Sequence, residues 1–197
     1  MLVITVDQRS SRLDVDRIDD LISRLHGADT GYRLVRPFER TAGDELQGML
    51  DDADDVVRIV LDLVRDGHWN VGVGLGRVNQ PVPNSVRAAS GPAFVAARDA
   101  VGRAKSSPRR VAVTGPDDGT AGDAEAVLVL LAAIVQRRSR AGWEVVDLVV
   151  AGLTQQDAAK RLGISAQAVS QRLQAALWRE ETHARPVAGR LLRRADS

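Results

Sequence analysis

Hydrophobic positions in the first 115 residues follow two alternating spacings. Residues 2–6 form a short β-branched run that stops at Asp7, which is typical of a strand. Apolar residues at 15, 18, 21, 22 and 25 repeat at helical spacing and predict a helix over 13–25. The same criteria predict further strands at 33–40, 45–50, 69–78 and 110–114, and further helices at 54–64 and 86–104.

The order of these elements predicts the fold class of the first half. Strand, helix, two strands joined by the turn Thr41–Asp44, helix and strand are followed by one more helix and strand. This order is typical of a ferredoxin-like α/β (α+β) sheet with helices on one face. We therefore predict one such domain over residues 1–115.

A second, all-helical domain is predicted after a turn-rich segment. Residues 115–122 contain three glycines and one proline, which indicates a linker. Residues 123–140 then predict one long helix, apolar on all sides from 126 to 135. Such a helix must be covered on more than one side, by the sheet, the C-terminal helices or a second subunit. The helical domain is expected over 123–197, with a short helix at 143–150.

The segment from Leu153 to Leu173 carries the most specific pattern. Thr154 can cap a helix with Asp157 three residues later, while Ala158 faces inward. Gly163 supplies the left-handed residue of a tight turn.

A second helix is predicted from this turn to residue 181. Ser165 caps it, and Val169, Leu173 and Leu177 form its inner face. The whole motif is expected over 154–181.

This pattern resembles the helix-turn-helix of sigma-factor region four and of LuxR-type regulators. The resemblance implies that the second helix enters the major groove of double-stranded DNA with its N-terminal end first. Glutamine can pair with adenine, and basic side chains hold phosphates. The predicted DNA-contacting residues are Thr154, Lys160, Arg161, Ser165, Gln167, Ala168, Ser170, Gln171 and Arg172. A helical hairpin that binds protein instead of DNA is the alternative.

Two stretches of the first half resemble nucleotide cyclases. Arg40–Leu50, with its Gly43-Asp44-Glu45 turn, resembles the hairpin of class III nucleotide cyclases and diguanylate cyclases. Ser90–Arg98 resembles the Gly-Asp-x-Val-Asn-x-Ala-Ala-Arg segment of these enzymes. With an aspartate on the first strand, residues 2–105 are most similar to small bacterial SatD-type proteins.

The cyclase resemblance implies a site for Mg²⁺ with a nucleotide. Asp7 and Asp44 match the two metal-binding aspartates, on strands that are neighbours in a ferredoxin-like sheet. Arg98 matches the transition-state arginine. The predicted nucleotide-binding residues are Asp7, Arg9, Ser10, Gly43, Asp44, Glu45 and Arg98.

Departures from the cyclase pattern weaken the prediction of catalysis. Phe94 stands where cyclases have an asparagine, and the first 104 residues contain no lysine to read a purine. Losing such groups removes stabilisation of the developing charge. The carboxylates are then expected to serve a nucleotide-sensing pocket, or merely to build a turn at Asp44 and Glu45 and to cap a loop at Asp7.

Two smaller motifs each allow two interpretations. Ser10 and Ser11, with Arg9 and Arg12, form either a phosphate-binding loop or a polar connection. Glycines at 72, 74 and 76 share one strand face, which favours close helix packing over ligand approach.

Composition excludes several classes of protein. The chain has no cysteine, so disulfides, thiolate metal sites and thiol nucleophiles are excluded. His26, His68 and His183 lack metal-ligand spacing. The longest apolar run, 126–135, is about half of what spans a bilayer. We expect a cytoplasmic protein without a membrane segment.

Charge is distributed unevenly between the two halves. The formal net charge is +1, but residues 1–152 carry 19 basic and 22 acidic side chains, and residues 153–197 carry 8 and 4. The pattern favours a DNA-binding transcription regulator that forms a homodimer and has a non-catalytic cyclase-like domain. A Mg²⁺-dependent nucleotide cyclase or nucleotidyl transferase, and an interaction module that binds no DNA, remain the alternatives.

Overall fold

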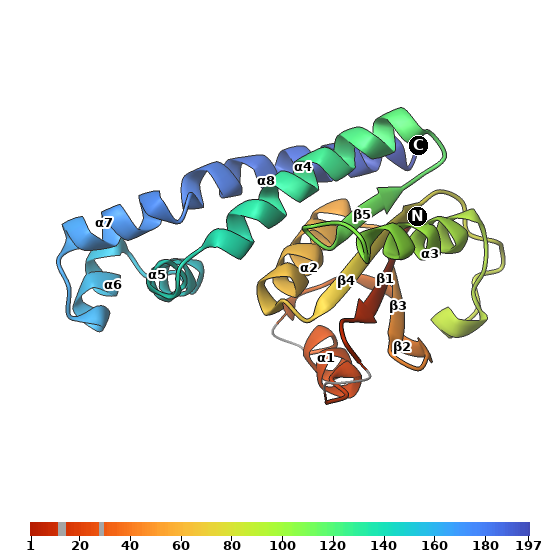
Figure 1. The fold of residues 1–197 in the computed structure, drawn as a ribbon, viewed down its shortest axis with the longest axis horizontal. Coiled ribbons are helices and arrows are strands. Elements are labelled where there is room, and N and C mark those ends of the chain that lie inside the picture. The colour runs from red at the N-terminus through yellow and green to blue at the C-terminus, as the bar shows by residue number, and fades with distance from the viewer. Residues whose placement is uncertain (12–14, 28–29) are drawn as a thin grey trace.

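The protein is a mixed α/β molecule built on one sheet (Figure 1). The computed structural model describes residues 1–11, 15–27 and 30–197, and within them the sheet has five strands in the order β2-β3-β1-β4-β5. Neighbouring strands are antiparallel except β4 and β5, which are parallel. The strands are β1 (Leu2–Gln8), β2 (Leu34–Ala42), β3 (Glu45–Leu50), β4 (Trp69–Leu75) and β5 (Val111–Thr114). The predicted hairpin is confirmed, with Gly43 and Asp44 between its strands.

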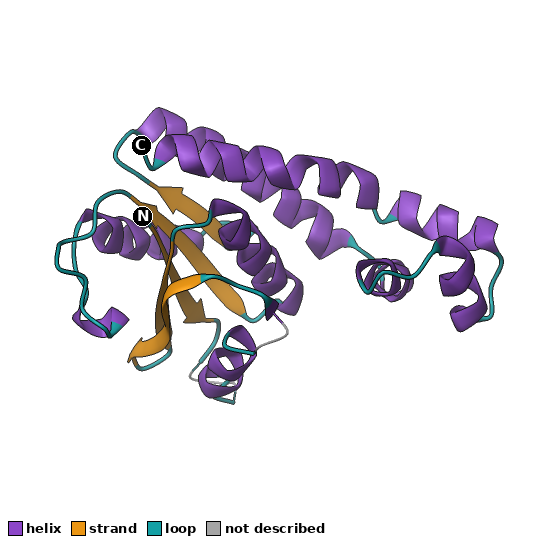
Figure 2. Ribbon diagram, turned by 180° about the vertical axis from the view of Figure 1, so that it is seen from behind, coloured by secondary structure: helices purple, strands orange, loops and turns teal. Residues whose placement is uncertain are grey.

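Helices cover both faces of the sheet, which corrects the prediction of one covered face. Leu2, Ile4 and Val6 face a core formed with α1 (Ile18–Leu25) and α2 (Ala53–Asp66). Val3 faces the opposite way, toward α3 (Pro92–Ala104). Figure 2 shows helices on both sides of the strands.

Glycines on β4 explain how α3 packs on the second face. A Cβ atom added to Gly72 or Gly74 would lie 2.2 Å from backbone atoms of α3. A side chain at either position would therefore force the helix away from the sheet. The interpretation of these two glycines as helix-packing residues is confirmed. Gly76 instead adopts a φ of +129° just after β4, and the strand ends there.

Two predicted helices are shorter than expected. The helix predicted over 86–104 is divided into the 3₁₀ turn η2 (Val86–Ala88) and α3. Gly91 has a φ of +135°, and Pro92 suits only the first turn of a helix. In the helix predicted over 13–25, α1 begins at Ile18, and Leu13 lies outside the described residues.

Five helices make up the second half of the chain as described. They are α4 (Asp118–Arg137), α5 (Arg140–Val150), α6 (Gln155–Leu162), α7 (Ala166–Ala175) and α8 (Trp178–Ala195). The last five residues of the expected linker 115–122 are helical, because the Asp117 carboxylate accepts a hydrogen bond from the Thr120 N–H and starts α4 there.

The long helices α4 and α8 run side by side and share the core of the sheet (Figure 1). Leu128 and Leu131 of α4 and Leu192 of α8 belong to the same buried cluster as β1 and β4. A second, smaller core joins α5, α6 and α7, beyond the edge of the sheet. In the described part of the chain, no helix combines the length and the apolar character needed to cross a membrane.

Candidate functional site

Local hydrogen bonds define the two helices predicted after Leu153. Thr154 Oγ1 accepts a hydrogen bond from the Asp157 N–H at 3.2 Å and donates one to its carboxylate at 2.7 Å. Gly163 has a φ of +65°, and Ser165 Oγ accepts from the Ala168 N–H at 3.1 Å. The predicted caps and the left-handed turn residue are therefore confirmed.

The inner faces of these helices pack against α5. Ala158, Val169 and Leu173 are buried in a cluster with Val145 and Val146. Because alanine is small, α6 can lie close to α7. These three predicted inward positions are confirmed.

Leu177 does not belong to the inner face, because the second helix ends at Ala175 instead of 181. Leu177 has a φ of +50° and is 43% exposed. Arg138, buried at the junction of α4 and α5, donates two hydrogen bonds to the Ala176 carbonyl, at 3.2 and 3.0 Å. In a continuous helix, the Ala176 carbonyl would accept a hydrogen bond from an N–H group one turn later. Because Arg138 supplies the hydrogen bonds instead, it stabilises the break between α7 and α8.

The outer face of α7, which we define as Gln167, Ser170 and Gln171, is exposed. Within the described residues, none of these three side chains has an intramolecular hydrogen-bond partner. Their amide and hydroxyl groups are thus available to another molecule. Ala168, on the same side, is half-buried.

The basic residues predicted to hold phosphates differ in their surroundings. Arg161 is exposed, and Lys160 is exposed with its Nζ 3.6 Å from Asp157. Arg172 is half-buried, and its guanidinium lies 3.4 Å from the Glu144 carboxylate of α5. Lys160 and Arg161 are therefore the freer cations of this set.

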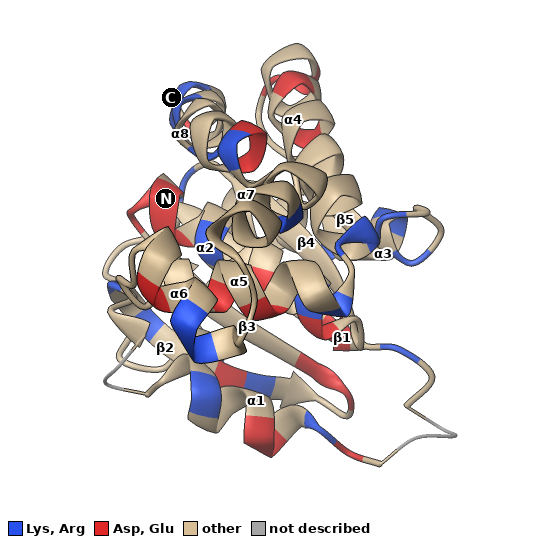
Figure 3. Ribbon diagram, turned by 90° about the vertical axis from the view of Figure 1, so that its left-hand side faces the viewer, with Lys and Arg blue, Asp and Glu red and all other residues tan. Residues whose placement is uncertain are grey.

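Positive charge of the C-terminal segment is divided between two ends of the molecule. Figure 3 shows basic residues on α6 and again at the C-terminal end of α8. Arg193, at that end of α8, contacts Asp54 of α2 at 3.1 Å. The charge near α7 is consequently smaller than the count over 153–197 suggests.

Four residues of the predicted nucleotide site do meet in one pocket, of about 470 Å³, which we call the β1 pocket. Asp7, Arg9, Ser10 and Asp44 line it. Gly43 lines an adjoining pocket with Asp44. Arg98 and Phe94 line a separate pocket against α3, where the Arg98 guanidinium lies 4.0 Å from Glu45. Arg98 and the two aspartates therefore do not line the same pocket, although Glu45, the register partner of Asp7, lies next to Arg98.

The carboxylates of the β1 pocket are engaged by neighbouring side chains. Asp7 is 7% exposed, lies 2.6 Å from Lys105 Nζ and accepts a hydrogen bond from Asn70 Nδ2 at 3.0 Å. Asp44 accepts a hydrogen bond from the Ser11 hydroxyl. Arg12, the other expected member of this loop, lies outside the described residues.

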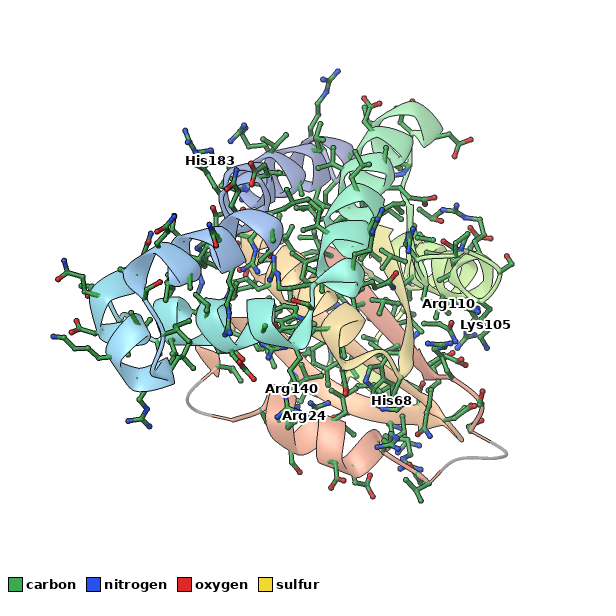
Figure 4. All side chains as sticks on the ribbon, turned by 60° about the vertical axis from the view of Figure 1, so that its left-hand side comes forward. Arg24, His68, Lys105, Arg110, Arg140 and His183 are labelled. Atoms are coloured by element: carbon green, nitrogen blue, oxygen red, sulfur yellow. The ribbon has the colours of Figure 1, made fainter. Side chains whose placement is uncertain are left out.

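Sequence reasoning missed four residues of the β1 pocket: Gln8, Asn70, Lys105 and Arg110. Asn70 is the register partner of Asp7 on β4, so correct strand pairing would have identified it. Figure 4 shows Lys105 and Arg110 close together beyond the end of α3. No periodic pattern in the sequence indicates either residue.

As placed, the residues of the β1 pocket do not fit Mg²⁺. Two carboxylates would be enough for Mg²⁺ that also binds the phosphates of a nucleotide, but Asp7, one of the two in this pocket, is already paired with the ammonium group of Lys105. In the described part of the chain, no three His, Cys, Asp or Glu side chains are grouped for a metal, and Figure 4 shows His68 and His183 far apart. Mg²⁺ with a nucleotide stays a prediction, and it requires Lys105 to leave Asp7.

Two arginine contacts connect the helices around α7 to the rest of the molecule. Arg65 of α2 forms two hydrogen bonds with Asp147 of α5, at 2.6 and 2.7 Å, and its guanidinium stacks 3.8 Å from the Trp143 ring. Arg138 forms a fully buried ion pair with Glu181 of α8. The orientation of α6 and α7 is therefore tied to both α2 and α8.

Comparison with known proteins adds no relative. No protein-family model, curated protein or solved structure matches this chain. A functional conclusion therefore depends on the geometry of the two sites described above.

Proposed function

We propose that the chain is a DNA-binding transcription regulator in which α6 and α7 form a helix-turn-helix and α7 reads the major groove. The observation that carries this proposal is the outer face of α7, whose side chains have no intramolecular partner among the described residues. Glutamine amides at 167 and 171 can pair with adenine, and the hydroxyl of Ser170 can bond either kind of base edge.

The surroundings of α7 also suit DNA. Ser165, which caps the N-terminal end of α7, is exposed. In this mode of docking, the N-terminal end of the second helix meets the base edges. Lys160 and Arg161 lie on α6, where they can contact the phosphate backbone. The resemblance to sigma-factor region four and LuxR-type regulators supports the same assignment.

For the sheet region we propose a non-catalytic, ferredoxin-like domain of the cyclase or SatD type. The strand order β2-β3-β1-β4, with β1 antiparallel to both neighbours, supports the ferredoxin-like assignment. The ion pair of Asp7 with Lys105, and the position of Arg98 in another pocket, support the absence of cyclase activity. Incubation with ATP or GTP and Mg²⁺ or Mn²⁺ tests this, and product that disappears in Asp44→Ala would contradict it.

A gel-shift experiment tests DNA binding by the full chain. The probes are genomic fragments of the native host, beginning with the region upstream of the chain's own gene. We expect Gln171→Ala to weaken binding to the best fragment by about 5- to 150-fold, the cost of about 1–3 kcal/mol for a lost base contact. Gln80→Ala, at an exposed position of the sheet region, is the matched control and should leave binding unchanged.

One outcome would overturn the proposal. If the wild-type chain binds no genomic fragment at low salt, α6 and α7 form an interaction module for protein, which was the alternative interpretation of this motif. A single helix-turn-helix rarely holds a specific site by itself, because adequate affinity usually requires two half-sites, so the proposal includes a homodimer.

A further inference from the structure

The helix pair α4 and α8 leaves an apolar groove uncovered on the side that does not face the sheet. The groove has a volume of about 890 Å³. Val127, Leu130 and Ile134 of α4 line it together with Ala184 and Val187 of α8. Leu130 is 66% exposed and Val187 is 37% exposed, although both lie in the middle of long helices. Large exposed apolar residues gathered in one groove indicate a contact surface.

Each of the two helices carries a regular stripe that passes through this groove and extends beyond its lining at Asp123, Leu191 and Arg194. Both stripes advance by four, three, four and three residues, the spacing of helices that pack lengthwise against other helices. The α4 stripe consists of Asp123, Val127, Leu130, Ile134 and Arg137. The α8 stripe consists of Glu180, Ala184, Val187, Leu191 and Arg194.

The charges at the ends of the stripes show what kind of partner fits. Each stripe has an acidic residue at its N-terminal end and an arginine at its C-terminal end. Asp123, Arg137 and Glu180 have no ion-pair partner among the described residues. Interaction with the helix dipole accounts for Glu180 and for the two arginines, which lie in terminal turns, but not for Asp123 in the second turn of α4 or for the exposed leucine.

We infer that this α4–α8 face binds the same face of a second copy of the chain. In an antiparallel arrangement about a two-fold axis, Leu130 lies near the axis and Arg137 meets an acidic residue of the second copy. That residue is Asp123 if α4 crosses α4, and Glu180 if α4 crosses α8. Either arrangement makes each contact twice and forms a four-helix contact. The inference deepens the homodimer of the proposed function by naming its surface.

The molar mass of the full chain in solution, without DNA, tests this inference. We expect wild type to sediment at twice its 21.2 kDa at micromolar concentration. Leu130→Glu should weaken the dimer by about 30-fold or more, as for a central interface residue. Because Leu130 is exposed, circular dichroism of this variant should match wild type. Val95→Glu, at an equally apolar and 72% exposed position on α3, is the matched control and should remain dimeric.

Charge variants give a second readout. Arg137→Glu should weaken the dimer in either arrangement, whereas Arg137→Lys should retain it. A monomeric wild type, or equal dissociation by Val95→Glu and Leu130→Glu, would overturn the inference. A stable dimer that binds no DNA would refute only the proposed function, and a DNA-binding monomer only this inference.

Discussion

The outer face of α7 and the β1 pocket are both polar, yet their side chains behave differently. In the β1 pocket, Asp7 is bound by Lys105 and Asn70, and most of its surface is buried. On α7, Gln167 and Gln171 are exposed, and within the described residues neither has an intramolecular partner. Polar residues that satisfy one another stabilise a fold, whereas exposed ones without partners are available for recognition. The comparison therefore favours α7 over the pocket as the functional surface.

The largest effect is expected where the two regions are joined. Glu181 and Arg138 form an ion pair in which both side chains are 0% exposed. Glu181→Ala leaves the arginine charge buried without its partner, so we expect the free energy of unfolding to fall by about 3–5 kcal/mol. Urea denaturation of wild type and variant measures this difference in the free energy of unfolding. A loss below about 1 kcal/mol would mean that α7 and the sheet are not held together in this way.

One substitution in the β1 pocket and one on the outer face of α7 test the comparison directly. Asp7→Ala removes the partner of Lys105 and of Asn70 Nδ2, and we expect a loss of about 1–3 kcal/mol in the free energy of unfolding. Gln171→Ala should change it by less than about 0.5 kcal/mol, because the side chain is exposed and unbonded. Thermal or urea denaturation of both variants measures the two losses in the free energy of unfolding. The reverse order of effects would break the comparison.

A smaller effect concerns the two groups of basic residues. Arg161 lies beside α7, whereas Arg193 lies at the far end of α8 against Asp54. We expect Arg161→Ala to reduce the slope of log affinity for DNA against log salt concentration by about 1. Arg193→Ala should leave the slope unchanged. Equal slopes for the two variants would show that DNA contacts both ends of the molecule.

The smallest effect is a pH dependence within the sheet region. Burial raises the pKa of Asp66, but hydrogen bonds from Trp69 Nε1 and Arg24 Nη2, both at 2.6 Å, outweigh it and hold the pKa below 3.8. Since the pKa is lower in the folded state, this stabilisation is present above pH 3.8 and is lost as the pH falls through the folded pKa.

The measurement for Asp66 is the free energy of unfolding as a function of pH. Asp66→Asn should make it fall less steeply from about pH 5 downward. Gln80→Ala, at an exposed position without a titrating group, serves as the control and should keep the wild-type slope. An identical slope for Asp66→Asn and wild type would contradict the assignment.

What the sequence predicts well in this chain is local. The caps Thr154 and Ser165 act on N–H groups three residues away, and Gly163 needs only its own backbone angle. The pattern of these residues therefore predicts α6 and the start of α7 closely. The end of α7 was missed because Arg138, 38 residues away in the chain, bonds the Ala176 carbonyl.

The candidate site in the sheet region shows the same limit. Asp7 and Asp44 were expected to meet because strand pairing follows from the order of elements, and both do line the β1 pocket. Their partners depend on distant contacts: Asn70 lies 63 residues from Asp7, and Lys105 reaches it from the end of α3. The face that α3 covers is also decided by packing, through Gly72 and Gly74, and element order does not determine it.

The connection between α7 and α8 has a mechanical consequence. Only Ala176 and Leu177 separate the two helices, and Arg138 holds the first of them. So short a connection, with one carbonyl bonded by Arg138, couples the orientation of α7 to that of the helix pair. Two copies joined through α4 and α8 would hold their α7 helices at one fixed angular phase. Inserting one base pair between two half-sites rotates one against the other by about 35° and should abolish simultaneous engagement.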